Sequence, residues 1–381
     1  MRTALVRGTT VNAMIRPKAV AKTRRGFLGS TAAFCWAGLG RAADAPSLAI
    51  SPVDAVTLQV VVDNATFGPF LPDQNLPGLK IIRSSGGSSG ALMSRRPLLA
   101  EFGLSVLAQS RLGSATKRVL VDFGYSPEVI HNNLSLLEID PRSLDASVLS
   151  HGHLDHYGGF RGLFAGLDSH RKLPLVVGGE EVFCERVAMI GTPPPLMGAL
   201  DRGQLEKAGF DVRVRSNPQL LDGHAFTTGG IPLASFERAA IPTQMRPGVG
   251  CQANALSAAK RREKLIPDDG EHELATCLVI NNLGLVVIAS CSHRGVINSV
   301  RRAQEISGIS KVHAVIGGFH LVRPRTEEEA RQTVAEFAKI DPTYLIPMHC
   351  TGEVFTSEAL RVMPQKVIRP YVGTKLVMGE A

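Results

Sequence analysis

The 381-residue chain has 44% hydrophobic and 20% charged residues, an ordinary composition for a soluble globular protein, and it is long enough for one large domain or two small ones. Its formal net charge of +8 comes almost wholly from residues 1–45, which hold eight Lys or Arg and one Asp. The other 34 basic and 33 acidic residues nearly cancel, so the charge gives no indication of a nucleic acid or an anionic membrane as partner.

The N-terminal segment predicts export through the twin-arginine route. Residues 22–25 read Lys-Thr-Arg-Arg, an apolar run follows from Gly26 to Gly40, and small residues end the segment at 43–45. The apolar run is too short to span a bilayer, so we expect no stable membrane anchor. We predict a cleaved signal over residues 1–45 and a periplasmic or secreted single domain over residues 46–381.

The cysteines beyond the predicted signal leave their pairing open. They are odd in number, so in an oxidising compartment at least one thiol is unpaired, or none is paired. No two have the spacing of a zinc-binding Cys-x-x-Cys motif; they are Cys184, Cys251, Cys277, Cys291 and Cys350.

The first part of the domain has strand-like runs separated by loops. An opening strand is expected over residues 56–64, and a flexible Gly/Ser-rich insertion over 84–90. Two strands follow at 101–108 and 118–122. Ser126 as N-cap and Pro127 at the first helical position then indicate the start of a helix.

A strand at 146–149 ends in the most specific feature of the chain, a group of three imidazoles and one carboxylate within six residues. Zinc, iron and manganese take such nitrogen and oxygen ligands, and can share a site in pairs. We therefore predict that these four residues bind metal: His151, His153, Asp155 and His156. Next we expect a helix over 159–167, a strand over 173–177, and helices over 180–189 and 201–208.

The segment 211–267 does not divide clearly into elements. Its basic patch 260–262 is interpreted as a solvated face, with contact to a substrate phosphate as the alternative. The last third is more regular. It predicts a hairpin (274–280 with 285–290), then a helix at 295–306, a strand at 311–317, a helix from a capping box at 326–329 to about 340, and a strand at 343–348. This alternation is typical of parallel strands in one sheet.

Four of the predicted strands run into a histidine: His151, His293, His320 and His349. The carboxyl ends of parallel strands meet at one edge of a sheet, so the pattern predicts a convergent site there. His293 and His349 are therefore expected at this site. For His320, substrate contact or general acid catalysis is as plausible as metal binding. Cys291 is a ligand, a group that supports the ligands, or a redox-sensitive thiol.

The remaining histidines are interpreted as surface or hydrogen-bonded structural residues: His131, His170, His224 and His313. His272, between two glutamates, is a weaker candidate for the site.

The His-x-His-x-Asp-His motif, with Asp122-Phe-Gly one strand earlier, resembles the metallo-β-lactamase superfamily. The resemblance implies an α/β fold, a four-layer αββα sandwich with a metal centre at one edge. It implies that His151 and His153 bind one metal and that Asp155 and His156 bind the second. It further implies that His349 is the last metal ligand of the site. His293, also expected to be a ligand, stands near the usual bridging aspartate, and Cys291 stands closer to that aspartate's own place.

Further motifs resemble one subgroup of the superfamily over roughly residues 56–375; they lie at 101–105, 121–124, 291–298, 316–321 and 349–352. This subgroup includes dihydropterin ribofuranosylaminobenzene phosphate synthases and many metal-dependent hydrolases. The chain departs from it at 229–233, which reads Gly-Gly-Ile-Pro-Leu instead of Gly-Glu-Ile-Pro-Arg, and at 178–179, where Gly-Gly replaces His-Pro. The lost charges and the export signal favour a hydrolase over the synthase.

We therefore predict a hydrolase with two divalent metals, most plausibly zinc, with iron or manganese as alternatives. Its substrate would be a small molecule with a phosphoester, pyrophosphate or lactone bond. Asp155 would both bind metal and orient the nucleophile, His320 would protonate the leaving group or hold the substrate, and Asp122 would hold the ligand loop. The alternatives are a dihydropterin-dependent transferase that releases pyrophosphate, and a non-catalytic metal-binding protein. The sequence leaves the oligomeric state open.

Overall fold

The computed structural model of the protein describes residues 48–67, 71–83, 96–167 and 171–379. These residues belong to one compact unit, Ala45–Ala381. The predicted export signal and the Gly/Ser-rich insertion at 84–90 lie outside the described residues.

The larger of two main sheets has nine strands, and four neighbouring strands at one side of it, β10, β7, β6 and β5, run parallel. In spatial order the nine are β10 (Phe210–Val214), β7 (Leu173–Val177), β6 (Ala146–Leu149), β5 (Ala115–Val121), β4 (Ser105–Leu112), β1 (Ala55–Val62), β19 (Lys375–Gly379), β3 (Leu79–Ile82) and β2 (Gln74–Leu76).

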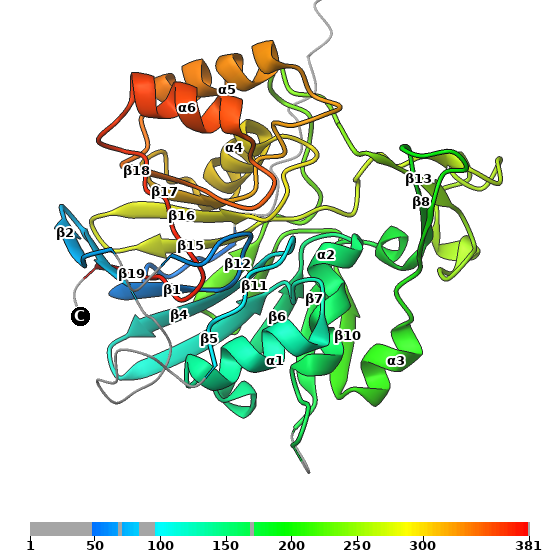
Figure 1. Cartoon of the computed structure of the whole chain (residues 1–381), viewed down its shortest axis with the longest axis horizontal. Helices are drawn as coiled ribbons and strands as arrows, with labels where there is room; N and C mark the ends of the chain where they lie inside the picture. The colour runs from blue at the N-terminus through cyan, green and yellow to red at the C-terminus, as the bar shows by residue number, and fades with distance from the viewer. Residues whose placement is uncertain (1–47, 68–70, 84–95, 168–170, 380–381) are drawn as a thin grey trace, which may run out of the picture. The chain divides into compact units, whose positions relative to one another are not determined.

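The second sheet has six strands, of which β16, β17 and β18 are parallel, as the alternation of strands and helices predicted. In spatial order they are β11 (Gln219–Leu221), β12 (Ala225–Thr227), β15 (Thr276–Ile280), β16 (Gly284–Ala289), β17 (Val312–Gly317) and β18 (Tyr344–Pro347). A small third sheet lies beside the other two (Figure 1); it contains β14 (Ile266–Pro267), β13 (Thr243–Arg246), β8 (Glu185–Ala188) and β9 (Leu196–Gly198).

The two main sheets face each other across a shared apolar core and are covered by helices on their outer faces. One buried cluster joins β1 and β4 of the first sheet to β16 and β17 of the second. A second cluster packs α1 (Pro127–Leu136) on the first sheet. A third packs α4 (Val296–Ser307), α5 (Glu327–Ile340) and α6 (Glu353–Val362) on the second sheet (Figure 1). The expected four-layer αββα sandwich is therefore confirmed.

Most local predictions are confirmed where a specific end signal supported them. Helix α1 begins at Pro127 after Ser126, and α5 begins with a complete capping box between Thr326 and Glu329. The strands β15 and β16 form the predicted hairpin. The predicted helix over 201–208 is α3 (Arg202–Lys207), capped by the side chain of Asp201.

The predicted helix over 159–167 is wrong. The chain forms a short α2 (Leu154–Tyr157) and then a 3₁₀ turn over Gly158–Gly162. Its glycines pass so close to the loop after β5 that an added Cβ on Gly159 would lie 2.0 Å from the Phe123 carbonyl oxygen. This close approach holds the segment against that loop instead of letting it continue as a regular helix.

The helix expected over 180–189 is also wrong. The segment forms a 3₁₀ turn over Glu180–Phe183 and then β8, which pairs with β13 on one side and β9 on the other. Strand pairing with segments distant in sequence outweighs a helical propensity that is only a weak prior.

The basic patch at 260–262 is not uniformly a solvated face. Arg261 and Arg262 are exposed, but Lys260 is buried and its ammonium forms ion pairs with Glu181, Asp269 and Glu271. The sequence could not show this, because the three partners meet Lys260 only through the fold.

Over the described residues, no helix combines the length and the apolar character needed to cross a membrane.

Candidate metal centre

Side chains from both main sheets converge at one edge of the sandwich. The loop after β6 contributes His151, His153, Asp155 and His156, whereas His293, His320 and His349 follow β16, β17 and β18. Ring centroids of neighbouring imidazoles lie 4.2–4.9 Å apart throughout the group. The convergence predicted from the strand ends is therefore present in the structure.

Three imidazoles form the first half of the group, and each is held at one ring nitrogen. His151 Nδ1 lies 2.9 Å from Ser150 Oγ, His153 Nε2 lies 3.1 Å from Thr243 Oγ1, and His293 Nδ1 lies 3.1 Å from the Ala240 carbonyl oxygen. The Nε2 atoms of His151 and His293 are buried without a hydrogen-bond partner. Histidines that bind metals are typically fixed in this way through the other nitrogen.

Asp155, His156 and His349 form the second half. His156 Nδ1 lies 2.8 Å from Asp122 Oδ2, and the Nε2 atoms of His156 and His349 approach Asp155 Oδ2 at 3.5 and 3.2 Å. The other face of His349 is held by Asn64, whose Oδ1 lies 3.4 Å from Nδ1. Here too one nitrogen of each ring faces the protein and the other faces the shared carboxylate.

Cys291 lies between the two halves. Its thiol can share a cation with Asp155, His156 and His349, or with His151 and His293, because the candidate ligand atoms of each group lie within 4.8 Å of one another. The Sγ atom is 3.1 Å from His156 Nε2 and 3.3 Å from Cys350 Sγ. Its thiol also lies within 4.8 Å of candidate ligand atoms of His320 and Cys350, so Cys291 is common to three sets of candidate ligands.

Electrostatics favour neutral rings in the first half. Burial, together with the neighbouring histidines, holds the pKa of His151 and His293 well below the usual range. Burial and the charge of Arg186 lower the pKa of His153 to about 4. A neutral imidazole keeps the lone pair that a metal needs.

In the second half, negative charge dominates. Burial opposes the charged form of His156, but Asp155 and Asp122 outweigh it and raise its pKa to about 10. Burial likewise opposes ionisation of Asp155, yet His156 and His349 hold its pKa well below the usual value. The anionic surroundings that favour a proton on His156 also suit a cation.

Several residues at this edge of the sandwich have unfavourable backbone dihedral angles. Four non-glycine residues have left-handed φ angles: Asp122 (59°), Ser292 (60°), His320 (41°) and His349 (47°). Each lies in a turn directly after a strand or beside a candidate ligand. Such conformations cost of order 1–3 kcal/mol each and persist where the surroundings fix them, often at functional sites.

His320 belongs to the group but has a different environment. Its ring lies 4.2 Å from that of His293, and neither of its nitrogens has a hydrogen-bond partner. It lines a cavity of about 220 Å³ together with His153, Asp155 and His293. His320 therefore faces the space where a substrate would meet the candidate ligands.

Sequence reasoning missed the polar network under the ligand loop. Buried Arg186 donates to Asp268 Oδ2 at 2.8 Å and lies 3.0 Å from His272 Nε2. Asp268 accepts from Thr243 Oγ1, which contacts His153, so the network reaches a candidate ligand. The only signal was the run of acids around His272, which belongs to this support and not to the imidazole group.

Glu273 is a second missed residue, because its carboxylate accepts from the backbone N–H groups of His293 and Arg294 at 2.8 and 2.7 Å. It thereby fixes the turn that carries His293.

The other histidines lie apart from the group. His131 is exposed on α1. His224 is hydrogen-bonded to Ser110, and His313 to the Gly78 carbonyl oxygen. His170 lies outside the described residues.

The donor set fits the metals that the sequence predicted. Buried ring nitrogens without partners, a buried carboxylate and a thiol surround one place, and each ring is held from behind. Fold and site together define an αββα sandwich with candidate ligands for two divalent ions at its edge.

Comparison with known proteins gives the same class. Residues 101–170, which include the ligand loop, match the model of the metallo-β-lactamase superfamily. A crystal structure of a metal-dependent hydrolase of the β-lactamase superfamily, Tm1679, aligns with a TM-score of 0.60 at 21% identity, over 84% of this chain and 98% of that one. The chain thus has the metallo-β-lactamase fold, and its residues 101–170 match the model of that superfamily.

Two relatives come from Methanocaldococcus jannaschii. The 7,8-dihydropterin-6-methyl-4-(β-D-ribofuranosyl)-aminobenzene-5'-phosphate synthase is 29% identical over 286 residues, which is 72% of this chain and 91% of that protein. An uncharacterized protein is 26% identical over 260 residues, 68% of this chain and 86% of that protein. The resemblance to the synthase subgroup, predicted from the motifs, is therefore confirmed.

Proposed function

We propose that the protein is a hydrolase that acts on a small molecule with a phosphoester, pyrophosphate or lactone bond and holds two divalent metal ions, most plausibly zinc. The observation that carries the proposal is the arrangement of the imidazoles. In each of five rings one nitrogen is held by a protein group. The other nitrogen of His151, His293 and His349 is buried without a hydrogen-bond partner, and that of His156 lies beside Cys291 and Asp155.

His151 and His293 would hold one ion, and Asp155, His156 and His349 the other, with Cys291 within reach of both sets. His153, whose ring centroid lies 4.7 Å from that of His151 and 4.9 Å from that of His293, would complete the first set. When bound, such ions supply Lewis acidity and lower the pKa of water. The residues add positioning: Asp155 accepts a proton or hydrogen bond from the nucleophile, and Asp122 keeps His156 and Ser150 in place.

His320 is our candidate for the group that protonates the leaving group. It lines the cavity beside His153 and His293, and a protonated ring nitrogen there could donate a proton to the leaving oxygen. The thiols of Cys291 and Cys350 are its nearest candidate partners in the protein.

A second candidate function is a dihydropterin-dependent transferase that releases pyrophosphate. The similarity to the archaeal synthase over 91% of its length favours it. Against it stand the glycines and leucine at 229–233, where the subgroup carries a glutamate and an arginine, since these charges would suit a polar or phosphorylated substrate.

We also propose export to the periplasm or the medium. The twin-arginine segment motivates this, and a disulfide between Cys184 and Cys251 supports it, because disulfides persist mainly in oxidising compartments.

The test is an assay of the metal-loaded protein on phosphoesters, pyrophosphates and lactones, with His320→Gln and His131→Gln as matched variants. We expect water-dependent turnover that falls about 100-fold in His320→Gln and stays unchanged in His131→Gln. Pyrophosphate release that requires an added dihydropterin, without hydrolysis of the panel, would instead establish the transferase.

A further inference from the structure

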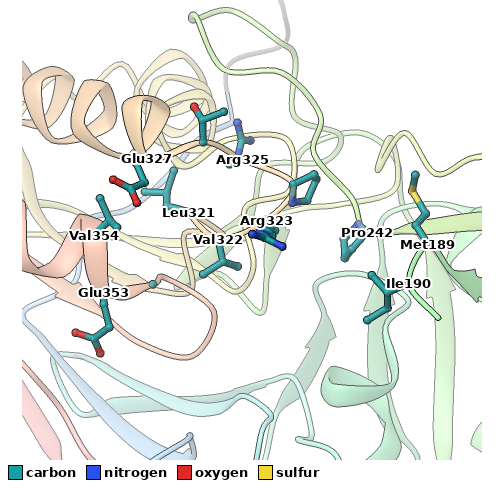
Figure 2. A pocket seen from close by; sticks show the side chains of 13 residues that line it. Met189, Ile190, Pro242, Leu321, Val322, Arg323, Arg325, Glu327, Glu353 and Val354 are labelled. Atoms are coloured by element: carbon teal, nitrogen blue, oxygen red, sulfur yellow. The ribbon is translucent and has the colours of Figure 1, made fainter. Parts of the chain in front are cut away.

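A long groove continues from the cavity over the candidate metal centre. It has a volume of about 880 Å³ and is lined by the segment after His320, by the start of α6 and by residues 189–190 (Figure 2). Ile190 and Pro242 line both hollows, so the groove and the cavity adjoin at these two residues.

The same loops build the groove and the candidate site. Leu321 and Val322 directly follow His320, and Gly352 lies three residues after His349. A molecule that reacts in the cavity would therefore extend along this groove. Its size is that of an ordinary small-molecule site.

The groove wall carries apolar side chains that the protein itself leaves uncovered. Met189 is 61% exposed, Ile190 74% and Val322 38%. In Figure 2 they lie on opposite sides of the groove, Val322 facing Ile190 and Met189 past Pro242. Exposed apolar residues gathered around a hollow indicate a ligand with apolar surface.

The ionisable residues of the groove do not favour an anion. Two arginines and two glutamates line the groove, so their formal charges cancel: Arg323, Arg325, Glu327 and Glu353 (Figure 2). Glu327 forms an ion pair with Arg331, and Arg323 is exposed to solvent. Arg325 is buried and donates to the carbonyl oxygens of Arg238 and His293. The cavity itself has no Lys or Arg among its lining residues. A phosphorylated substrate would normally be met by several converging cations, whereas Arg323 is the one groove cation without a partner among the described residues.

We propose that the groove binds the alkyl or acyl chain of a neutral lactone or ester whose carbonyl lies among the histidines. The inference rests on the proposed hydrolase function and narrows its substrate class. Water adds across the ester C–O bond, which breaks to give a carboxylic acid and an alcohol, so no further reactant is needed. Ile190 and Val322 are the residues that select for the chain.

Binding of ligands that cannot be hydrolysed tests the role of the groove separately from catalysis. The probes are 2-methyl-, 2-butyl- and 2-heptylcyclopentanone, which resemble lactones but cannot be hydrolysed, titrated calorimetrically into the zinc-loaded full chain. We expect affinity to rise about twofold for each added methylene, less than full burial would give because the groove is open.

Two variants and a matched control test whether the dependence of affinity on chain length comes from the groove. Ile190→Asn and Val322→Asn should each weaken binding of the heptyl ketone at least about fivefold and leave the methyl ketone unaffected. Val362→Asn replaces a valine of similar exposure, 40%, on α6 outside the groove, and should change neither. Affinities that do not depend on chain length, or a heptyl affinity unchanged in both variants, would overturn the inference.

Turnover of γ-lactones with the same three chains separates the two proposals. Chain-dependent binding without hydrolysis would keep the groove and remove the hydrolase function. Hydrolysis at equal rates for all chains would keep the function and remove the groove. Tighter binding of butyl phosphate than of 2-butylcyclopentanone would overturn the neutral substrate class.

Discussion

Asp122 connects two candidate ligands through one carboxylate. It accepts from the Ser150 N–H and hydroxyl, each at 2.8 Å, and its Oδ2 lies 2.8 Å from His156 Nδ1. Ser150 in turn contacts His151. One buried side chain therefore sets the orientation of rings in both halves of the centre.

Asp122→Asn should lower metal affinity about 10–100-fold, because an amide has only one acceptor oxygen and cannot accept from both the Ser150 N–H and His156 Nδ1. Competition with a chelator of known affinity measures the change. Asp211→Asn, which alters an exposed carboxylate paired with Arg213, serves as control. Equal affinities for the two variants would mean that Asp122 does not position the ligands.

Glu237 is a buried carboxylate outside the candidate site. Its Oε2 accepts from the Asn298 N–H at the start of α4, while Oε1 has no partner. Burial raises its pKa from 4.5 to about 7, although Arg325 works in the opposite direction.

Because the folded pKa is the higher one, the folded protein binds more protons than the unfolded chain between about pH 4.5 and pH 7. The unfolding free energy should therefore fall as pH rises through this window, by about 1–3 kcal/mol. Glu237→Gln keeps the acceptor and removes the titration, so its urea unfolding should lack that part of the pH dependence. Parallel pH profiles for the two proteins would contradict the shift.

At the scale of elements, one disulfide fastens the small sheet. Cys184 directly precedes β8 and Cys251 follows β13, with a sequence separation of 67. Arg186 lies in β8 and Thr243 in β13, and both belong to the hydrogen-bond network that supports His153. The bond therefore stabilises the wall beneath the ligand loop.

Without reductant, we expect only three reactive thiols in the denatured chain from residue 46 on, because Cys277, Cys291 and Cys350 are free. The double variant Cys184→Ala, Cys251→Ala should lose about 2–4 kcal/mol of unfolding free energy. Its stability should no longer respond to reductant. Five reactive thiols in the untreated protein would show that the bond does not form.

An element could be predicted from the sequence when residues next to one another specify it. The ligand loop, α1 and α5 are specified by adjacent residues: metal ligands after a strand, Pro127 after Ser126, and the Thr326 capping box. The 3₁₀ turn after α2 and strand β8 depend on contacts with distant segments. Local patterns could not reveal them.

The same holds for the site. The imidazoles could be predicted because each follows a strand, and parallel strands end together. Thr243, Asp268 and Asn64 lie 90 or more residues from the histidines they support, within segments without a recognisable motif. Their roles appear only when the third sheet and the loop after β1 are placed beside the centre.

At the scale of the whole molecule, the two sheets each supply part of the centre. The first sheet provides the ligand loop after β6, and the second provides His293 and His349 after β16 and β18. Metal binding would therefore join the two halves of the sandwich and stabilise the folded state by mass action. Construction from both sheets also explains why loss of one histidine should disturb the whole centre.

The most direct test is the metal content per chain, measured by elemental analysis of the protein beside His151→Ala, His293→Ala and the exposed control His131→Ala. We predict about two metal ions in the parent and in His131→Ala, and a clear loss in the other two variants. One ion or none in the parent, unaffected by His293→Ala, would contradict a two-metal centre built from both sheets.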